Sequence, residues 1–413
     1  MMQFLKCLKP TLCSVLASGA TIALALVAPP PALAAISAGP PIQVPWLIGI
    51  NFFGAASSLA VLDDGSFAIA AVDFFLVSEQ DFSAELLVQF FRSNGAAQTR
   101  PTALIRPPAV VDSAGIGSVG DRYLLVSKND KRAYALFYSK QGTSLDTPIR
   151  WPYSDIPFFI TYYRFGAAPL WRFLPITYRV TGHDQEGHPF YSSFVQVADA
   201  DGLRLGAPVE LPVLDAAING SGQFVVVESA CSGCNTQGIQ IFDSAVKPLT
   251  PFLTAGVPQL YEPGGVQNSL PLVAINTQGQ ILLAWVAHVE EPTARRLVAR
   301  LFDETGSPVS DVLQLTPPAN ALSLEAEPIA LDDGSFLFAF ITQSLTSLSA
   351  KVFIERFDPR TQSVDEPIVL AAGHLGGAML AVNGSGKGVY VWQTLAPSEA
   401  VDDAYMRTVR MTP

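Results

Sequence analysis

The sequence predicts an all-β fold built from a repeated unit, and three observations lead to this prediction. A short phrase recurs along the chain: a turn containing glycine, an apolar run, a gap of variable length, and a second apolar run that often ends in Arg-x-Phe-Asp. The runs are rich in Val, Ile, Phe and Tyr, which suit pleated, half-buried surfaces. Copies recur every 45–60 residues or so, roughly the spacing of propeller and solenoid arrays. We therefore predict a β-propeller of seven four-stranded blades.

The copies follow one another from residue 57 to the end of the chain. The clearest joins Gly279-Gln-Ile-Leu-Leu-Ala-Trp285 to Leu297-Val-Ala-Arg-Leu-Phe-Asp303. The remaining copies are marked by residues 64–71 with 87–91, 123–126 with 134–138, 194–197, 222–227 with 239–243, 333–340 with 352–358, and 386–392 with 405–409. Several of these runs are apolar throughout, as expected of strands buried on both faces between stacked sheets.

The third copy is irregular, and it leaves the number of blades open. Residues 157–179 are dense in aromatic side chains and include Pro169 and Pro175. Proline has no backbone N–H and fits a central strand poorly. Six or eight blades are therefore alternatives to seven.

The last copy stops at Pro413, one strand short of the others. An extended segment, Pro41-Ile-Gln-Val-Pro-Trp46, resembles the outer-strand runs of other copies. We expect this segment to pair onto the last blade and close the ring, which would remove an exposed sheet edge. A linker without fixed structure is the alternative.

These motifs resemble those of bacterial secreted repeat propellers, whose unit reads Asp-Gly-(apolar)-Trp followed by Arg-x-Phe-Asp-x-x-Gly. The resemblance covers residues 57–413 or thereabouts, and it implies a fold more than a function, because propellers carry many unrelated activities. The tryptophan is kept only at Trp285 and Trp392. Ala71, Glu228 and Phe340 stand at the corresponding positions.

The first 34 residues read as a secretory signal peptide, so residues 35–413 form the predicted propeller domain. Lys6 and Lys9 precede an apolar region, and Ala32-Leu33-Ala34 offers a cleavage site. We predict an extracytoplasmic protein that is secreted, periplasmic or at the cell surface. An uncleaved N-terminal anchor is the alternative.

The composition argues against several classes of partner. The chain of 413 residues has 25 basic and 36 acidic residues, a net charge of −11, and no basic cluster. Binding to nucleic acid or to an anionic membrane surface is therefore not expected. No later segment is long and apolar enough for a membrane span. We expect a monomer.

Two cysteines remain after the signal peptide, in the loop Cys231-Ser-Gly-Cys234. In an exported chain they are expected to form a local disulfide. A redox pair or half of a zinc site are the alternatives, but no helix N-terminus and no further ligands are evident nearby.

The candidate binding face is built from the loops that join the second and third strands of each copy, because function usually lies on loops held by a rigid scaffold. Five of these loops are residues 72–84, 228–238, 286–296, 342–350 and 393–404. They carry Asp73, Glu79, Asp81, Glu228, His288, Glu290, Glu291, Glu399, Asp402 and Asp403. No cofactor is expected. A converging acidic rim would suit calcium, and solvated loop charges are the simpler alternative.

The densest aromatic region is residues 158–178, in which Trp171 is the candidate ligand-stacking residue. Aromatic faces stack on sugars or pack against a partner, whereas core packing between blades is the alternative. Asn219-Gly-Ser221 and Asn383-Gly-Ser385 match the acceptor pattern for N-glycosylation, but hairpin-turn chemistry accounts for both.

The function we expect is that of a binding or interaction module with a protein or carbohydrate ligand on the loop face. The alternatives are a polysaccharide hydrolase or lyase that uses carboxylates at the mouth of the central channel, and a structural scaffold without a small-molecule site. No catalytic residue can be assigned, because no nucleophile elbow, zinc-protease motif or phosphate loop is present.

Overall fold

The computed structural model describes most of the chain after the predicted signal peptide. The described residues are 35–48, 57–76, 82–105, 111–129, 132–145, 149–150, 159–165, 173–183, 189–199, 204–205, 207, 209–229, 236–259, 268–288, 295–316, 322–324, 328–343, 349–395 and 401–412. The chain divides into a unit of Met1–Ala35 with Pro413 and a unit of Ile36–Thr412. The predicted signal peptide, residues 1–34, lies outside the described residues.

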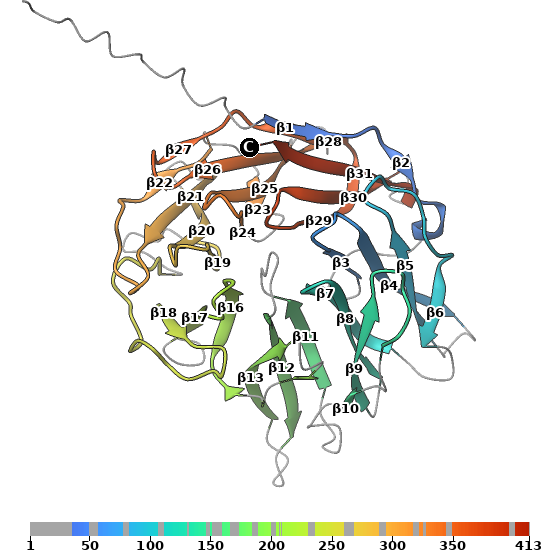
Figure 1. Cartoon of the computed structure of the whole chain (residues 1–413), viewed down its shortest axis with the longest axis horizontal. Coiled ribbons are helices and arrows are strands. Elements are labelled where there is room, and N and C mark those ends of the chain that lie inside the picture. Colours follow the sequence, from blue (N-terminus) through green and yellow to red (C-terminus); the bar gives the residue numbers. More distant parts are fainter. Residues whose placement is uncertain are drawn as a thin grey trace, which may run out of the picture. The chain divides into compact units, whose positions relative to one another are not determined.

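The unit Ile36–Thr412 is all-β and has the architecture of a β-propeller, as predicted. Its sheets are arranged around a common axis, with β3, β7, β11, β16, β19 and β29 close to it (Figure 1). Neighbouring strands pair antiparallel and mostly in chain order, so each sheet is a meander. Among the described residues no helix is long and apolar enough to cross a membrane.

Three sheets have the predicted four strands. They are β3 (Ser57–Val61), β4 (Phe67–Leu76), β5 (Phe82–Phe91) and β6 (Thr102–Ile105); β7 (Val111–Val119), β8 (Arg122–Asn129), β9 (Arg132–Ser139) and β10 (Ile149–Arg150); and β19 (Leu272–Ile275), β20 (Ile281–His288), β21 (Arg295–Phe302) and β22 (Leu313–Gln314).

The other sheets depart from four strands. One has three: β16 (Val213–Ile218), β17 (Phe224–Ser229) and β18 (Gln237–Phe242). Its outer position is taken by residues 248–253, which form only isolated bridges to β18. The larger sheets split a strand position between short strands. They are β11 (Phe159–Phe165), β12 (Phe173–His183), β13 (Pro189–Asp199), β14 (Arg204–Leu205) and β15 (Val209–Glu210); β23 (Leu322–Leu324), β24 (Ile329–Ala330), β25 (Phe336–Gln343), β26 (Ala350–Asp358), β27 (Ser363–Val364) and β28 (Ile368–Gly373); and β29 (Leu375–Val382), β30 (Lys387–Leu395) and β31 (Val401–Thr412) with β1 (Ala35–Ala38) and β2 (Ile42–Gln43).

The N-terminal segment pairs onto the last sheet, as predicted. β2 pairs with β31 through Ile42 opposite Met406 and Gln43 opposite Tyr405. Beyond β2 the strand does not continue to Trp46, because Pro45–Leu47 form a short 3₁₀ turn, η1. Leu47 is fully buried there, and its carbonyl accepts a hydrogen bond from Gln393 Nε2 at 2.9 Å.

The irregular third copy forms a sheet, and Pro175 lies within strand β12. The expectation that this proline disfavours a central strand is corrected by the register. The β11–β12 ladder ends at Phe165 opposite Ile176, so Pro175 lies one residue beyond it. Pro175 pairs only with Val197 of β13. The missing N–H therefore removes nothing from the β11 side of the ladder.

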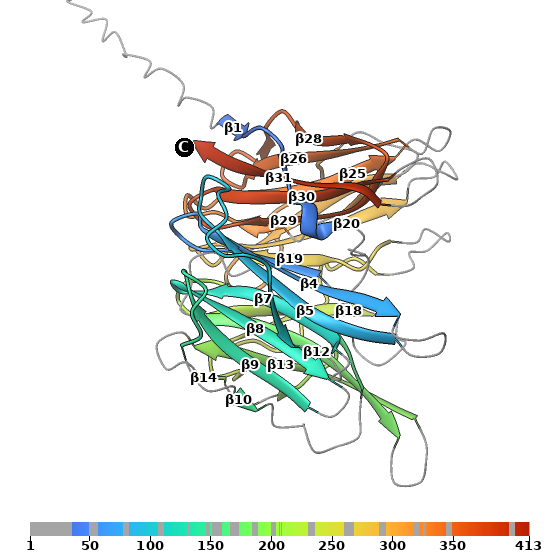
Figure 2. The same cartoon turned by 90° about the vertical axis from the view of Figure 1, so that its right-hand side faces the viewer.

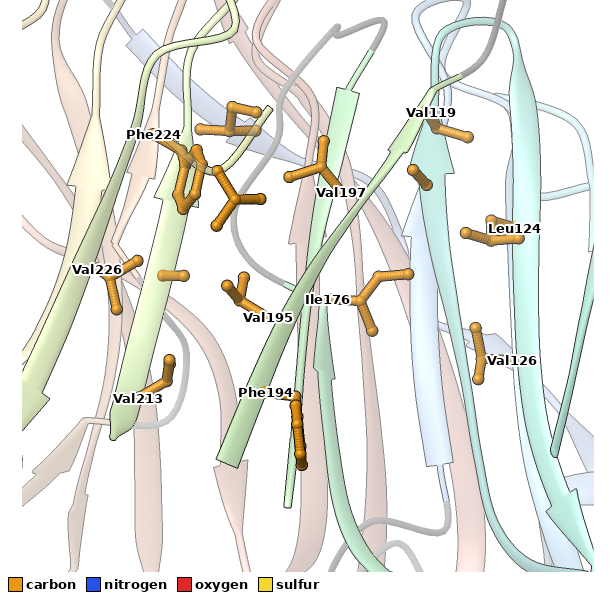
Figure 3. Packing of buried hydrophobic residues seen from close by; sticks show 14 of the residues in the cluster. Val119, Leu124, Val126, Ile176, Phe194, Val195, Val197, Val213, Phe224 and Val226 are labelled. Atoms are coloured by element: carbon orange, nitrogen blue, oxygen red, sulfur yellow. The ribbon is translucent and has the colours of Figure 1, made fainter. Parts of the chain in front are cut away.

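Apolar side chains fill the spaces between neighbouring sheets. In β17, Phe224 and Val226 belong to one buried cluster while Val225 and Val227 belong to the next. Figure 3 shows Phe224 and Val226 on one side of the β12–β13 hairpin and Leu124 on its other side. The wholly apolar runs are thus explained, because strands of this kind are buried on both faces.

The recurrent glycine turns are closed by polar side chains at one end of the sheets. The Asp of the Phe-Asp-x-x-Gly phrase caps the turn after the third strand: Asp303 Oδ1 accepts the backbone N–H groups of Thr305 and Ser307 at 2.9 Å. Gly306 follows with φ +81°, a conformation that side chains other than glycine rarely adopt. In the three-stranded sheet Val246 takes this place with φ +62° and is nevertheless buried.

Three asparagines link neighbouring sheets through the turns between first and second strands. Asn276 Nδ2 donates to the carbonyl of Gly334 at 2.8 Å, and Asn383 Nδ2 donates to that of Leu62 at 2.7 Å. Asn219 Nδ2 reaches the carbonyl of Asn276 at 3.5 Å. Asn219 and Asn383 are both only 2% exposed. These two glycosylation motifs are therefore structural turns, as the sequence indicated.

Candidate functional site

The connections between second and third strands lie at the ends of the sheets opposite to the asparagine turns, because the second strand runs from one end to the other. Figure 2 shows the sheets from the side. Several of these connections are shorter than the predicted loops. β4 and β5 extend to Leu76 and from Phe82, with Asp73 opposite Glu85, so much of residues 72–84 is a hairpin.

The predicted site residues fall into two groups. Asp73, Glu228, His288 and Asp402 lie on strands at this end of the sheets: Asp73 in β4, Glu228 in β17, His288 at the end of β20, opposite Arg295, and Asp402 in β31. Asp81, Glu290, Trp171, Cys231 and Cys234 lie outside the described residues. The disulfide and the role of Trp171 stay predictions.

Asp73 and Glu228 of this set have raised pKa values, and burial is the cause in both. Asp73 is half-buried, and burial raises its pKa above the usual range. Glu228 is only 5% exposed, and burial raises its pKa to about 7. Among the described residues no neighbouring charge contributes to either shift, so Asp73 and Glu228 are not an ion-coupled pair.

Glu228 stands where other copies have an aromatic residue. It pairs with Val213 of β16 and Gly238 of β18, near the end of the apolar strand β17. Side chains alternate along a strand, so Glu228 shares a face with Phe224 and Val226, which pack toward β12–β13 (Figure 3). Within the described part of the chain its Oε1 atom is buried without a hydrogen-bond partner.

A second polar cluster, missed from the sequence, lies at the same end of this sheet on its other face. Gln237 is 1% exposed, and neither side-chain amide atom has a hydrogen-bond partner among the described residues. Its backbone N–H donates to Gln259 Oε1 at 3.2 Å, and Asn268 Nδ2 donates to the Gln259 carbonyl at 2.9 Å. The one signal in the sequence is a glutamine at the start of an apolar strand, directly after the cysteine loop.

Carboxylates also gather at the opposite end, in the turns near the axis. Asp63 follows β3, Asp121 follows β7, and Asp332 precedes β25. Burial and the charges of Asp332, Asp64 and Asp121 raise the pKa of Asp63, whereas Lys387 lowers it. The side chains of these turn residues are partly covered but still exposed to solvent. Over the ranges the structure describes, no group of three or more His, Cys, Asp or Glu side chains is placed to hold a metal ion. Calcium at the other end stays a prediction.

Comparisons with known proteins find a similar fold in a solved structure but no match in sequence. No protein family model and no curated protein sequence matches the chain. Among solved structures, a polysaccharide lyase, Uly1, is similar with a TM-score of 0.51 and 10% identity, over 87% of this chain and 90% of that one. A protein of unknown function from Dyadobacter fermentans has a TM-score of 0.45 and 10% identity, over 91% and 99% of the two chains.

A third solved structure is the β-propeller domain of the Trilobed protease from Pyrococcus furiosus. Its TM-score is 0.44 and its identity 12%, over 85% of this chain and 95% of that one. At such identities the likeness concerns the fold alone, and function has to be argued from the site.

Proposed function

We propose that this protein is an exported, seven-bladed propeller that binds a protein or carbohydrate ligand at the end of the sheets where second and third strands are joined. The observation that carries the proposal is Glu228, a buried carboxyl group whose Oε1 atom has no hydrogen-bond partner among the described residues. A buried polar atom of this kind calls for an explanation, and a perturbed carboxyl group is a candidate for a functional site.

The seven-bladed form is part of this proposal. It is supported by the agreement between the copies in the sequence and the sheets in the structure. Six copies contribute the second and third strands of one sheet each, and the third copy, residues 194–197, contributes the third strand of another. The N-terminal strands supply the outermost position of the sheet that ends at Thr412.

The two ends of the sheets differ in how their polar groups are used. At one end, Asn219, Asn276, Asn383 and Asp303 cap turns or join sheets, so their hydrogen bonds serve the architecture. At the other end the connections vary in length, and Glu228 serves no turn. Binding by loops on a rigid scaffold fits the second end.

The chemistry of the ligand follows from the hydrogen-bond donor that Glu228 Oε1 lacks among the described residues. An ionised carboxylate only accepts hydrogen bonds, so a ligand hydroxyl or amide N–H would satisfy it. Val213, which pairs with Glu228, and Val226 on the same face of β17 provide apolar surroundings. A sugar or a peptide edge offers this combination of donor groups and apolar surface. Cys231 and Cys234 follow closely in sequence, and their proposed disulfide would brace the adjoining loop.

A polysaccharide-cleaving activity is not favoured by the described residues. Hydrolysis of glycosides generally requires a pair of carboxyl groups that flank the scissile bond. In the part of the chain that the structure describes, no second carboxyl group contributes to the pKa shift of Glu228. The binding hypothesis needs no such partner.

The test is a thermal-shift screen of the mature protein against oligosaccharides and peptides, in parallel with Glu228→Gln. Ligand binding to the native state raises the melting temperature with affinity and concentration. We expect at least one ligand to stabilise wild type and to bind Glu228→Gln at least tenfold more weakly. Glu366→Gln, at an exposed position, is the matched control and should bind like wild type. Equal binding by Glu228→Gln would exclude Glu228 from the site.

A further inference from the structure

The chain contains three Asn-Gly pairs, and the fold holds them to different degrees. They are Asn94-Gly95, Asn219-Gly220 and Asn383-Gly384. Asparagine is a thermolabile residue, and it loses its side-chain amide most readily before glycine, which has no Cβ atom to shield its backbone nitrogen from the preceding Cγ atom. In a folded protein the reaction further requires that the side chain and the turn can move.

Asn219 and Asn383 are locked in place. Each is only 2% exposed. Asn219 Oδ1 accepts three hydrogen bonds within its own turn, and Asn219 Nδ2 lies 3.5 Å from the carbonyl of Asn276. The side chain of Asn383 makes four hydrogen bonds, two of them to carbonyls of the neighbouring sheet. Neither Cγ atom can approach the following backbone nitrogen until these bonds are broken.

Asn94 is held much more weakly, in the exposed turn between β5 and β6. Among the described residues its side chain makes one hydrogen bond, in which Oδ1 accepts the Ala96 N–H at 3.0 Å. The backbone nitrogen that would attack it, that of Gly95, donates to the Arg92 carbonyl at 2.9 Å. Two hydrogen bonds within a single surface turn therefore have to open.

The turn that contains Asn94 packs against the N-terminal strand β2. A Cβ atom built on Gly95 would lie 2.5 Å from Ile42 Cδ1 and 3.7 Å from Met406 Cε. Ile42 of β2 and Met406 of β31 are register partners, so Gly95 lies against the pair that joins β2 to the last sheet. Gly95 is buried there with φ +84°. A change in the backbone next to Gly95 would therefore act directly on β2.

We propose that Asn94 is a site of spontaneous deamidation, and that the isoaspartate formed at this position loosens β2 from the last sheet. The backbone nitrogen of Gly95 loses its proton to the solvent and forms a bond to Asn94 Cγ. The Cγ–Nδ2 bond breaks, and the nitrogen leaves as ammonia after taking up a proton. Water then opens the cyclic imide, either at Cγ, which gives aspartate, or at the backbone carbonyl carbon, which gives isoaspartate.

The two products differ in their effect on the turn. Aspartate keeps the length of the backbone and the accepting oxygen. Asp64 and Asp333 show that it fits, because each accepts the N–H two residues further on at 2.9 Å and precedes a glycine with positive φ. Isoaspartate routes the main chain through its side chain and adds one carbon atom to the backbone before Gly95. We expect this added atom to displace Gly95 from Ile42.

The first test follows the three pairs by peptide mapping and mass spectrometry while the folded protein is incubated at pH 9, where the attacking nitrogen loses its proton more readily than at pH 6. Asn94 should be converted first. Asn219 and Asn383 should react at least about tenfold more slowly, because each has at least two more hydrogen bonds to break. In denaturant all three should react at similar rates. Equal rates in the folded protein, or earlier conversion of Asn219 or Asn383, would overturn the proposal.

The second test measures hydrogen exchange of residues 36–47 in the isoaspartate form, separated by chromatography from incubated wild type. This form should lose protection over the segment, whereas Asn94→Asp should keep it. Unchanged protection in the isoaspartate form would contradict the proposed effect on β2.

Asn94→Thr is the matched control, because threonine cannot form the imide. Threonine fits this place in the turn, since Thr305 precedes Gly306 in the same way and the Gly306 N–H donates to the Asp303 carbonyl. Incubated Asn94→Thr should keep the protection of residues 36–47. The same loss in this variant would show that conversion of Asn94 is not the cause and would overturn the proposal.

Discussion

Asn383→Ala is expected to lower the melting temperature by about 4 °C, because this side chain joins the sheet that ends the chain to the sheet that begins at β3. Its Nδ2 donates to the carbonyls of Leu62 at 2.7 Å and Asp63 at 3.2 Å. Its Oδ1 accepts from Ser385 Oγ at 2.9 Å and from the Lys387 N–H at 3.0 Å. The substitution removes all four bonds.

The expected change in melting temperature follows from the net contribution of these hydrogen bonds to the free energy of unfolding. Each contributes about 1 kcal/mol, and the Leu62 carbonyl still accepts from the Gly65 N–H, so the total is about 3 kcal/mol. For a unit of about 380 residues the entropy of unfolding is about 0.8 kcal/mol per degree, which converts this loss into about 4 °C.

The assay is differential scanning calorimetry at pH 7, with Asn94→Ala as the matched control. Asn94 also caps a turn, but among the described residues its side chain accepts one bond, from the Ala96 N–H at 3.0 Å, and reaches no other sheet. Its loss should lower the melting temperature by about 1 °C. Equal effects of Asn94→Ala and Asn383→Ala would refute the reasoning that the bond between sheets matters.

Asn383→Asp distinguishes the contribution of the donating Nδ2 group from that of the accepting Oδ1 atom. The acceptor atom is kept, but the donor is replaced by an oxygen beside Asp63, whose pKa is already raised by burial and by Asp332, Asp64 and Asp121. The variant should therefore be more destabilised at pH 8, where both carboxyl groups are ionised, than at pH 4.

Two further predictions concern the chain termini and the cysteines. Deletion of residues 41–46 should lower the melting temperature by on the order of 5 °C. The deletion removes the β2–β31 pairing and the hydrogen bond from the Val44 N–H to the Ala404 carbonyl at 2.8 Å. A deletion variant that melts like wild type would contradict closure of the ring by this segment. Cys231 and Cys234 should resist thiol labelling in the exported protein until a reductant is added, and immediate labelling would rule out the disulfide.

The repeated turns could be predicted from the sequence because their chemistry is local. Asp303 and Gly306 lie within one hairpin, so their spacing alone indicates the cap and the left-handed residue. The bonds from Asn276 and Asn383 could not be predicted, because they depend on how neighbouring sheets approach each other. Pro175 was misleading for a related reason: only the register shows that it lies beyond the β11 ladder.

The candidate site was predicted in part. Glu228 could be singled out as an acidic residue in place of an aromatic one, but its burial depends on the packing of β17 against β12–β13. Gln237 has no motif to mark it, and its amide, unpaired among the described residues, becomes evident only once the strands are assembled.

The most direct test of the proposed site is a carbon-13 NMR titration of the Glu228 carboxyl group, assigned by comparison with Glu228→Gln. If the carboxyl group is buried without a partner at the end of β17, it should titrate near pH 7 in the folded protein. A midpoint near 4.5, the ordinary value for glutamate, would show that Glu228 is solvated or paired and would contradict the proposed binding site.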